Sequence, residues 1–267
     1  MGWIRRINSL SPSQKEGFYR ILLPPSLYSR FQIDPISFSS GSTKVVRIWA
    51  PRWDQTALVE VRLEGMEEPL YSIQISDTVD YTQLEWDFLL VNDPQSPRFL
   101  TQVDSQGRDT LFGWAGRNVQ EEIKAMEAGL FPGQSRRGLG LTGEVIECLE
   151  FFCKTLTIKS IRLEALFYHN AITYERHGFS YFSGYHLMKR IHEEFLPGGK
   201  LYRLMDGSTP FRRREMAHTV RGRSWAIHDG ILFDADDELL AEGWSSPVMY
   251  RMVGKPRPMI TFPDPVY

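Results

Sequence analysis

The sequence predicts a single domain of the α/β (α+β) class, with a mixed, mainly antiparallel central sheet flanked by helices. The chain has 267 residues, of which 42% are hydrophobic and 24% charged, so it is long enough to bury a sizeable core. Residues 43–92 contain apolar segments of strand length separated by short turns, which is typical of an antiparallel meander. Residues 134–182 then alternate loop, helix, strand, short helix and strand.

The N-terminal residues 1–42 are expected to be a mainly helical segment ahead of the sheet. Ser11 followed by Pro12 is typical of a helix start, because Ser can cap the first turn and Pro fits the first helical position. Four strands are then expected, all rich in Val, Ile and Leu with alternation: Thr43–Trp49, Ala57–Leu63, Leu70–Ser76 and Leu84–Val91.

After this meander the chain reaches a glycine-rich loop, Gln134–Leu141. A weak hairpin pattern at Arg98–Val103 and Asp109–Phe112 comes first. Either this hairpin supplies the strand that precedes the loop, or a helical insertion stands there. A helix is predicted over Asn118–Ala128, with Asn118 as its N-cap.

A helix follows the loop, since apolar residues recur at spacings of four, four, three and four: Leu141, Val145, Leu149, Phe152 and Leu156. The next predicted elements are a strand at Ser160–Leu166, a short helix that Asn170 caps and that runs to Arg176, and a strand at Phe179–Phe182.

The C-terminal third is less regular. Helices are expected at Tyr185–Phe195 and Phe211–Thr219, and a last strand at Pro247–Val253. The predicted organisation is one domain over residues 1–267, with an N-terminal segment 1–42, a core formed by 43–184 and 247–254, and a helical insertion 185–246.

Charge and composition exclude several functional classes. The 31 Lys and Arg residues nearly balance the 33 Asp and Glu residues, so a general nucleic-acid binder is not expected. No apolar run reaches the roughly 18 residues of a membrane span. Cys148 and Cys153 lie on different faces of the expected helix and should be buried small hydrophobes, which fits a cytoplasmic protein. The six histidines form no metal-ligand pattern, so no metal is expected, and His169 is assigned to the surface or to a cap.

The glycine-rich loop is the first candidate site. Closely spaced glycines let backbone N–H groups converge, and the following helix adds the positive end of its dipole, so the loop suits a pyrophosphate. Arg136 and Arg137 would add positive charge. A triphosphate-binding loop is excluded because Leu141 follows Gly140 where Lys is required. A dinucleotide loop stays open, since Gly143 completes its glycine spacing.

A second motif lies one helix and one strand downstream, at Asn170–Phe179. Together with Arg136–Gly140 it resembles the two signatures of the GNAT acyl-CoA-dependent N-acetyltransferase superfamily. Asn170, Tyr174 and the Gly-Phe pair that ends the segment match the second signature. Ser135 departs from the first, where the family has Gln or Arg.

The resemblance implies a GNAT-like sheet that splays open between the strand before the loop and the strand after the helix, with the thioester of acetyl-CoA or another acyl-CoA between them. The implied pyrophosphate-binding residues are Arg136, Arg137, Gly138, Leu139, Gly140 and Leu141. Asn170 would contact the pantetheine arm, and Tyr174 would protonate the leaving thiolate. The acceptor would be a small-molecule amine or a peptide, and the insertions would flank its site.

No general base stands out. Glu85 and Asp87 share a strand face and Glu164 lies on the strand after the helix, so each is a candidate. The missing base leaves a rival interpretation, a catalytically inactive acyl-CoA-binding or scaffold protein of the same fold. A nucleotide-binding enzyme outside the family is the third alternative. The sequence leaves the acyl chain, the acceptor and the presence of a homodimer open.

Overall fold

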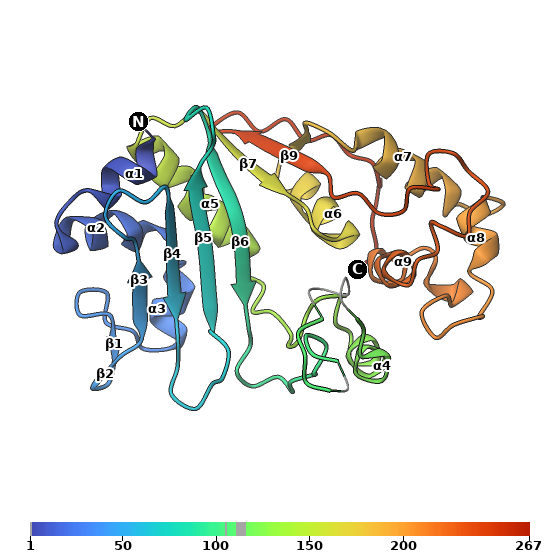
Figure 1. Ribbon diagram of the computed structural model, residues 1–267, viewed down its shortest axis with the longest axis horizontal. Coiled ribbons are helices and arrows are strands. Elements are labelled where there is room, and N and C mark those ends of the chain that lie inside the picture. Colours follow the sequence, from blue (N-terminus) through green and yellow to red (C-terminus); the bar gives the residue numbers. More distant parts are fainter. Residues whose placement is uncertain (1, 105, 111–115) are drawn as a thin grey trace. The chain divides into compact units, whose positions relative to one another are not determined.

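The computed structural model describes residues 2–104, 106–110 and 116–267 (Figure 1). It has a mixed α/β architecture, with a seven-stranded, mostly antiparallel sheet flanked by helices. The strand order is β3-β4-β5-β6-β7-β9-β8, and β1 (Ser39–Ser40) and β2 (Thr43–Lys44) form a separate pair.

The described residues divide into two compact units. The first unit combines 2–95, 138–163 and 250–257, and the second combines 96–137, 164–249 and 258–267. The single-domain organisation expected from the sequence stays a prediction.

The meander of the first unit confirms three of the predicted strands and the second part of the first one, since Thr43–Lys44 belongs to the separate pair with β1. β3 (Val46–Trp49), β4 (Thr56–Val61), β5 (Tyr71–Asp77) and β6 (Leu84–Val91) pair antiparallel in chain order. Their alternation places one set of side chains in the core, as with Ile73 and Ile75, while the other set includes the polar Gln74 and Ser76. One face of this sheet is therefore apolar and the other largely polar.

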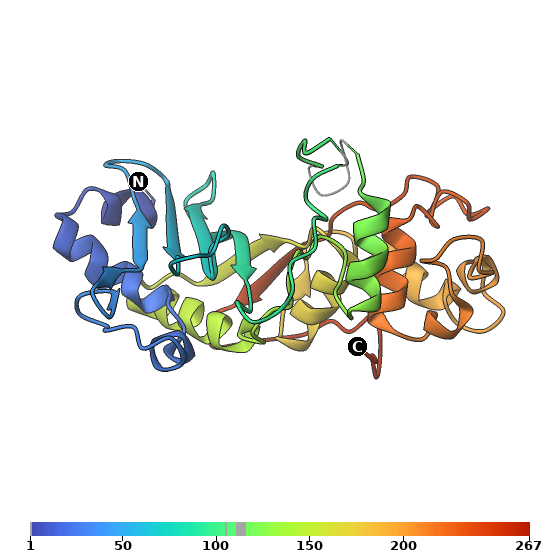
Figure 2. The ribbon, with the colours of Figure 1, turned by 90° about the horizontal axis from the view of Figure 1, so that it is seen from below.

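Helices cover the apolar face: α1 (Trp3–Asn8), α2 (Pro12–Tyr19), the 3₁₀ turn η1 (Arg20–Leu22), α3 (Pro25–Arg30) and α5 (Thr142–Thr155). α5 lies behind β5 and β6 in Figure 1, and Figure 2 shows it on one side of these strands. Its predicted stripe is confirmed: Val145, Leu149 and Phe152 are fully buried, and the Phe152 ring stacks on Tyr19 with 6.2 Å between centroids. The Asp77 carboxylate, on the sheet, caps α1 by accepting hydrogen bonds from the N–H groups of Ile4 and Arg5.

β7 (Ser160–Glu164) pairs in parallel with β6, and only over a short stretch. Leu84–Trp86 are registered with Ile161–Leu163, whereas β6 continues to Val91. The register between β5 and β6 also shifts here, because Trp86 faces Ile75 and Phe88 faces Gln74, which leaves Asp87 without a registered partner.

β6 is thus the strand before the loop, and the chain between them is an insertion that contains a helix. The described residues of the predicted hairpin add no strand to the sheet: Val103 and Asp109 form an isolated antiparallel bridge, and Phe112 lies outside the described residues.

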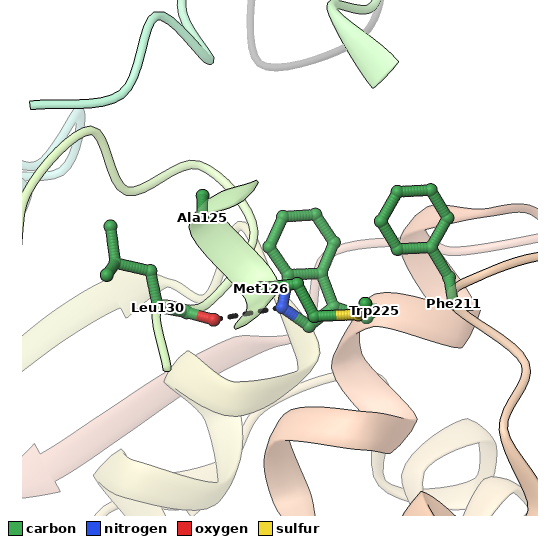
Figure 3. Close-up of a cluster of buried hydrophobic side chains, with 5 residues drawn as sticks. All are labelled: Ala125, Met126, Leu130, Phe211 and Trp225. Carbon is green, nitrogen blue, oxygen red and sulfur yellow. Dashed lines mark hydrogen bonds between the residues drawn. The ribbon is translucent and has the colours of Figure 1, made fainter. Parts of the chain in front are cut away.

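The second unit contains mostly helices: α4 (Val119–Glu127), α6 (Tyr168–Arg176), α7 (Tyr185–Glu194), α8 (Lys200–Leu204), the 3₁₀ turn η3 (Arg214–Met216) and α9 (Val220–His228). β8 (Ser180–Tyr181) belongs to it, and β9 (Val248–Met252) is divided between the units after Met249. α4 and α9 lie side by side (Figures 1 and 2). Ala125, Met126, Leu130, Phe211 and Trp225 form a buried cluster there, and the Trp225 indole N–H donates to the Leu130 carbonyl at 2.9 Å (Figure 3).

Two predictions about the helices of this unit were wrong. The helix expected at Phe211–Thr219 is only the short turn η3, and the helix α9 begins where that prediction ended. Asn170 is not an N-cap residue, because α6 begins at Tyr168 and Asn170 is its third residue. Its side chain still serves the helix start, since Oδ1 accepts the Phe167 N–H at 3.2 Å.

Candidate functional site

The glycine-rich loop ends in the first unit, at the N-terminus of α5. Gly138 lies so close to the end of β6 that a Cβ atom there would stand 3.3 Å from the Val91 carbonyl oxygen. Gly140 has φ +72°, a left-handed conformation that favours glycine. The two glycines therefore serve a close approach to β6 and a sharp turn into the helix.

Two neighbours hold this turn in place. Leu141 is buried, and its carbonyl accepts the first helical hydrogen bond of α5 from the Val145 N–H at 2.9 Å. The Leu139 carbonyl accepts from the Arg30 guanidinium at 3.3 Å. The acid in the first turn, Glu144, is engaged elsewhere, since Ser26 donates to it through N–H and hydroxyl. The loop thus presents a helix N-terminus whose nearest carboxylate is already hydrogen-bonded.

Arg136 and Arg137 belong to the second unit. The Arg136 guanidinium donates to the Ser96 carbonyl at 2.6 Å. Arg137 is exposed, and it donates to the Ala128 carbonyl through its guanidinium and to the Ser96 hydroxyl through its backbone N–H. Carbonyl and hydroxyl oxygens do not neutralise a charge, so Arg137 still carries an exposed positive charge.

Asn170 and Tyr174 lie one turn apart on α6, in the second unit. The Asn170 oxygen is used in capping, so its amide Nδ2 is the group suited to contact pantetheine. The Tyr174 ring packs on Phe179, with 5.5 Å between centroids. A tyrosine hydroxyl keeps its proton at neutral pH, and burial raises the pKa of Tyr174 further above its ordinary value.

The three candidate bases differ in their surroundings. Glu85 is paired with Arg162, whose guanidinium nitrogen lies 2.5 Å from the carboxylate. Glu164 is exposed at the end of β7. Asp87 follows the last β6 residue that pairs with β7, and it accepts a hydrogen bond from the Ser76 hydroxyl at 3.0 Å.

Of the three, Asp87 is the best placed to accept a proton. Desolvation at the sheet raises its pKa to about 6, the nearby Glu85 charge adds to the rise, and the hydrogen bond from Ser76 opposes it. Part of the Asp87 side chain is exposed, so solvent screens these effects. A carboxylate of this kind is ionised at neutral pH and is a stronger base than an ordinary Asp.

His169 is buried rather than at the surface, which corrects the prediction. Its ring stacks on Phe131 and Phe167, and its Nδ1 lies 2.9 Å from the Ser224 hydroxyl. Burial lowers the pKa of His169 to about 3, and the His228 charge acts in the same direction. A histidine that remains neutral so far into acid is a weak base, so this His–Ser pair does not resemble an activated nucleophile.

The second unit also contains a pocket of about 590 Å³ that sequence patterns did not indicate. It is lined by residues from two separate stretches, 164–168 and 224–246, and no periodicity connects them. Most of the second stretch lies outside any helix or strand.

Comparison with protein-family models, with curated proteins and with solved structures found no match. Within the described ranges, no helix is both long and apolar enough to cross a membrane. The same ranges contain no group of three or more His, Cys, Asp or Glu side chains that could hold a metal ion.

Proposed function

We propose that this chain is an acyl-CoA-dependent N-acyltransferase of the GNAT type, which moves an acetyl or longer acyl group to an amine. The observation that carries the proposal is the arrangement around β6 and β7. These parallel strands pair over only three residues while β6 continues to Val91, and the glycine loop that leads into α5 approaches the end of β6 at Val91. A parallel strand pair of short overlap beside a glycine loop fits the arrangement that the GNAT resemblance implies for a thioester and its pyrophosphate.

In this proposal the loop from Arg136 to Leu141 binds the pyrophosphate and Asn170 contacts the pantetheine arm. The acceptor amine attacks the thioester carbonyl, so the new C–N bond forms as the C–S bond breaks. Asp87 accepts a proton from the attacking amine. Tyr174 donates its proton to the departing CoA thiolate and regains one from solvent.

Mass spectrometry of the protein purified without added ligand tests the cofactor class. Bound CoA or acyl-CoA supports the proposal, whereas a bound dinucleotide would favour the nucleotide-binding alternative. Calorimetry with acetyl-CoA then tests the loop. Gly138→Asp should abolish binding, because it adds a side chain at the close approach to Val91 and a negative charge facing the pyrophosphate.

Gly17→Asp is the matched control. Gly17 is an exposed helical glycine of the same unit with open space around it, so the same substitution should leave acetyl-CoA affinity unchanged. Unchanged affinity in a folded Gly138→Asp variant would contradict the pyrophosphate assignment.

A catalytically inactive acyl-CoA-binding protein is the second candidate, and burial of Tyr174 favours it. Raising the pKa of this hydroxyl moves it further from that of a thiol, which weakens the driving force for proton donation. Thiol release with a panel of polyamines, amino acids and aminoglycosides separates the two candidates. Tight acetyl-CoA binding with no release on any amine would favour the inactive protein.

A further inference from the structure

The pocket of the second unit has walls suited to an organic cation. Four aromatic side chains line it, Phe167, Tyr168, Phe233 and Trp244, and its volume of about 590 Å³ lies in the range of small-molecule sites. Two of these rings are held in place. Tyr168 is buried, and the Trp244 indole N–H donates to the Leu166 carbonyl at 2.8 Å.

The third ring, Phe233, is two-thirds exposed and rests on glycine backbone. A Cβ atom at Gly243 would collide with the Phe233 ring, and one at Gly230 would touch it. Both glycines have positive φ, so side chains are disfavoured at these two positions for backbone reasons as well. The glycines leave room for the ring at the edge of the pocket, where a ligand could cover it.

The charges of the lining favour a positive ligand. Glu164 lines the pocket, is exposed, and makes no ion pair with any other described residue. The lining contains neither Lys nor Arg. Of the other polar side chains in the lining, Ser224 lies against His169 and His228 lies 3.1 Å from Glu122. The buried Tyr168 hydroxyl has no hydrogen-bond partner among the described residues.

We propose that this pocket binds a protonated primary amine attached to an aromatic or other flat apolar group, with the ammonium at Glu164 and the ring among Phe167, Tyr168, Phe233 and Trp244. An ammonium near aromatic faces gains cation–π attraction, and a carboxylate at the mouth remains hydrated until the ligand arrives. The inference rests on the proposed function where it names this amine as the acyl acceptor. Binding itself is independent of that function.

Three probes of one shape test the charge requirement: phenethylamine, the neutral 2-phenylethanol and the anionic 3-phenylpropionate. Each is titrated into the full-length protein and followed by ligand-observed NMR at low salt. We expect phenethylamine to bind about five- to tenfold more tightly than 2-phenylethanol, and 3-phenylpropionate to bind least. Equal affinity for the amine and the alcohol, or no binding of the amine, would overturn the proposal.

Two variants test whether the ligand binds in this pocket. Glu164→Gln should weaken phenethylamine about three- to fivefold and leave 2-phenylethanol unchanged, because only the charge interaction is removed. Phe233→Ala should weaken both. The matched controls are Glu64→Gln and Phe182→Ala, an exposed acid and an exposed aromatic outside the pocket, which should change neither.

The outcomes separate the two proposals. If the affinity for phenethylamine depends on Glu164 but the amine receives no acyl group from acetyl-CoA, the binding pocket is supported and its role as the acceptor site is refuted. If acyl transfer occurs to other amines while phenethylamine does not bind, the proposed acyltransferase function is supported and the assignment of this pocket is refuted. An unchanged phenethylamine affinity in both Glu164→Gln and Phe233→Ala would place the binding elsewhere and refute the pocket.

Discussion

At the scale of single residues, Tyr174 decides between an enzyme and a binding protein. Its hydroxyl is protonated at neutral pH, as that of an ordinary tyrosine is, and burial raises its pKa further. Tyr174→Phe removes only that oxygen and keeps the ring against Phe179. If the hydroxyl is the general acid, kcat should fall roughly 10²-fold, while acetyl-CoA affinity measured by calorimetry stays within about twofold.

A second partly buried tyrosine provides the control. The Tyr28 hydroxyl is buried without a hydrogen-bond partner among the described residues, so Tyr28→Phe should change neither the rate nor the affinity. A Tyr174→Phe variant that turns over like wild type on an accepted amine would remove Tyr174 from the mechanism.

The buried His169 should make the free energy of unfolding depend on pH. Its pKa is about 3 in the folded protein, below the ordinary value near 6.5, so between these values the unfolded chain binds a proton that the folded protein does not. The stabilising effect is complete above pH 6.5 and is lost as the pH falls toward 3. Between pH 7.5 and 5.0 the free energy of unfolding should drop by about 2 kcal/mol from this residue.

Urea denaturation of the wild type and of His169→Gln at both pH values measures this contribution. The variant should be less stable at pH 7.5, because it loses the stacking on Phe131 and Phe167, but its loss between the two pH values should be smaller by about 2 kcal/mol. An identical drop in both proteins would show that His169 does not carry the effect.

The candidate site was only partly predictable at this scale. The loop at Gly138 and Gly140 was placed before a helix because glycine spacing and the apolar stripe are local signals. The roles of Asn170 and His169 were not, because each depends on where α6 begins, and an aromatic residue, Phe167, occupies the N-cap position. Sequence patterns rank Asn well above Phe there.

At the scale of elements, the packing of α4 on α9 depends on Trp225 (Figure 3). Its indole fills the centre of the cluster and satisfies the Leu130 carbonyl. Trp225→Phe should lower the free energy of unfolding by about 2–4 kcal/mol, because it leaves a cavity and an unpaired buried carbonyl. Chemical denaturation measures this cost.

An exposed tryptophan tests whether the cost is specific. Trp53 is nearly half exposed, so Trp53→Phe should change stability by less than about 0.5 kcal/mol. A Trp225→Phe variant as stable as this control would contradict the assigned role of the indole.

The same elements show why the strands were predicted and α9 was not. β4 and β5 have one apolar and one polar face, so alternation identifies them. α9 is buried on nearly all sides, even at Arg223, and Gly222 inside it lies against the Met216 backbone, where a Cβ would collide. A helix that has lost its polar face and contains a glycine gives no 3.6-residue pattern.

At the scale of the whole molecule, neither unit is continuous in sequence. The chain passes from one unit to the other after residues 95, 137, 163, 249 and 257. Composition and local periodicity carry no information about such crossings, which is why the division into units could not be predicted. The last crossing returns the C-terminal residues 258–267 to the second unit.

These ten residues are expected to stabilise the second unit. Thr261 donates to the buried carboxylate of Glu175 through its N–H and hydroxyl, and the Phe262 ring lies 4.0 Å from the Arg223 guanidinium carbon. Deleting residues 258–267 leaves Glu175 with fewer hydrogen-bond donors and Arg223 without this ring. The second unit should therefore lose several kcal/mol of stability, which would be seen as faster amide hydrogen exchange in α6 and α9.

Thr261→Val removes only the hydroxyl and should lower the free energy of unfolding by about 1.5–3 kcal/mol. The control is Ile260→Ala, which shortens the exposed neighbouring side chain and should lower it far less. If the deletion leaves exchange in α6 and α9 as slow as in the full-length protein, the C-terminal residues do not stabilise this unit and Glu175 is satisfied by other groups.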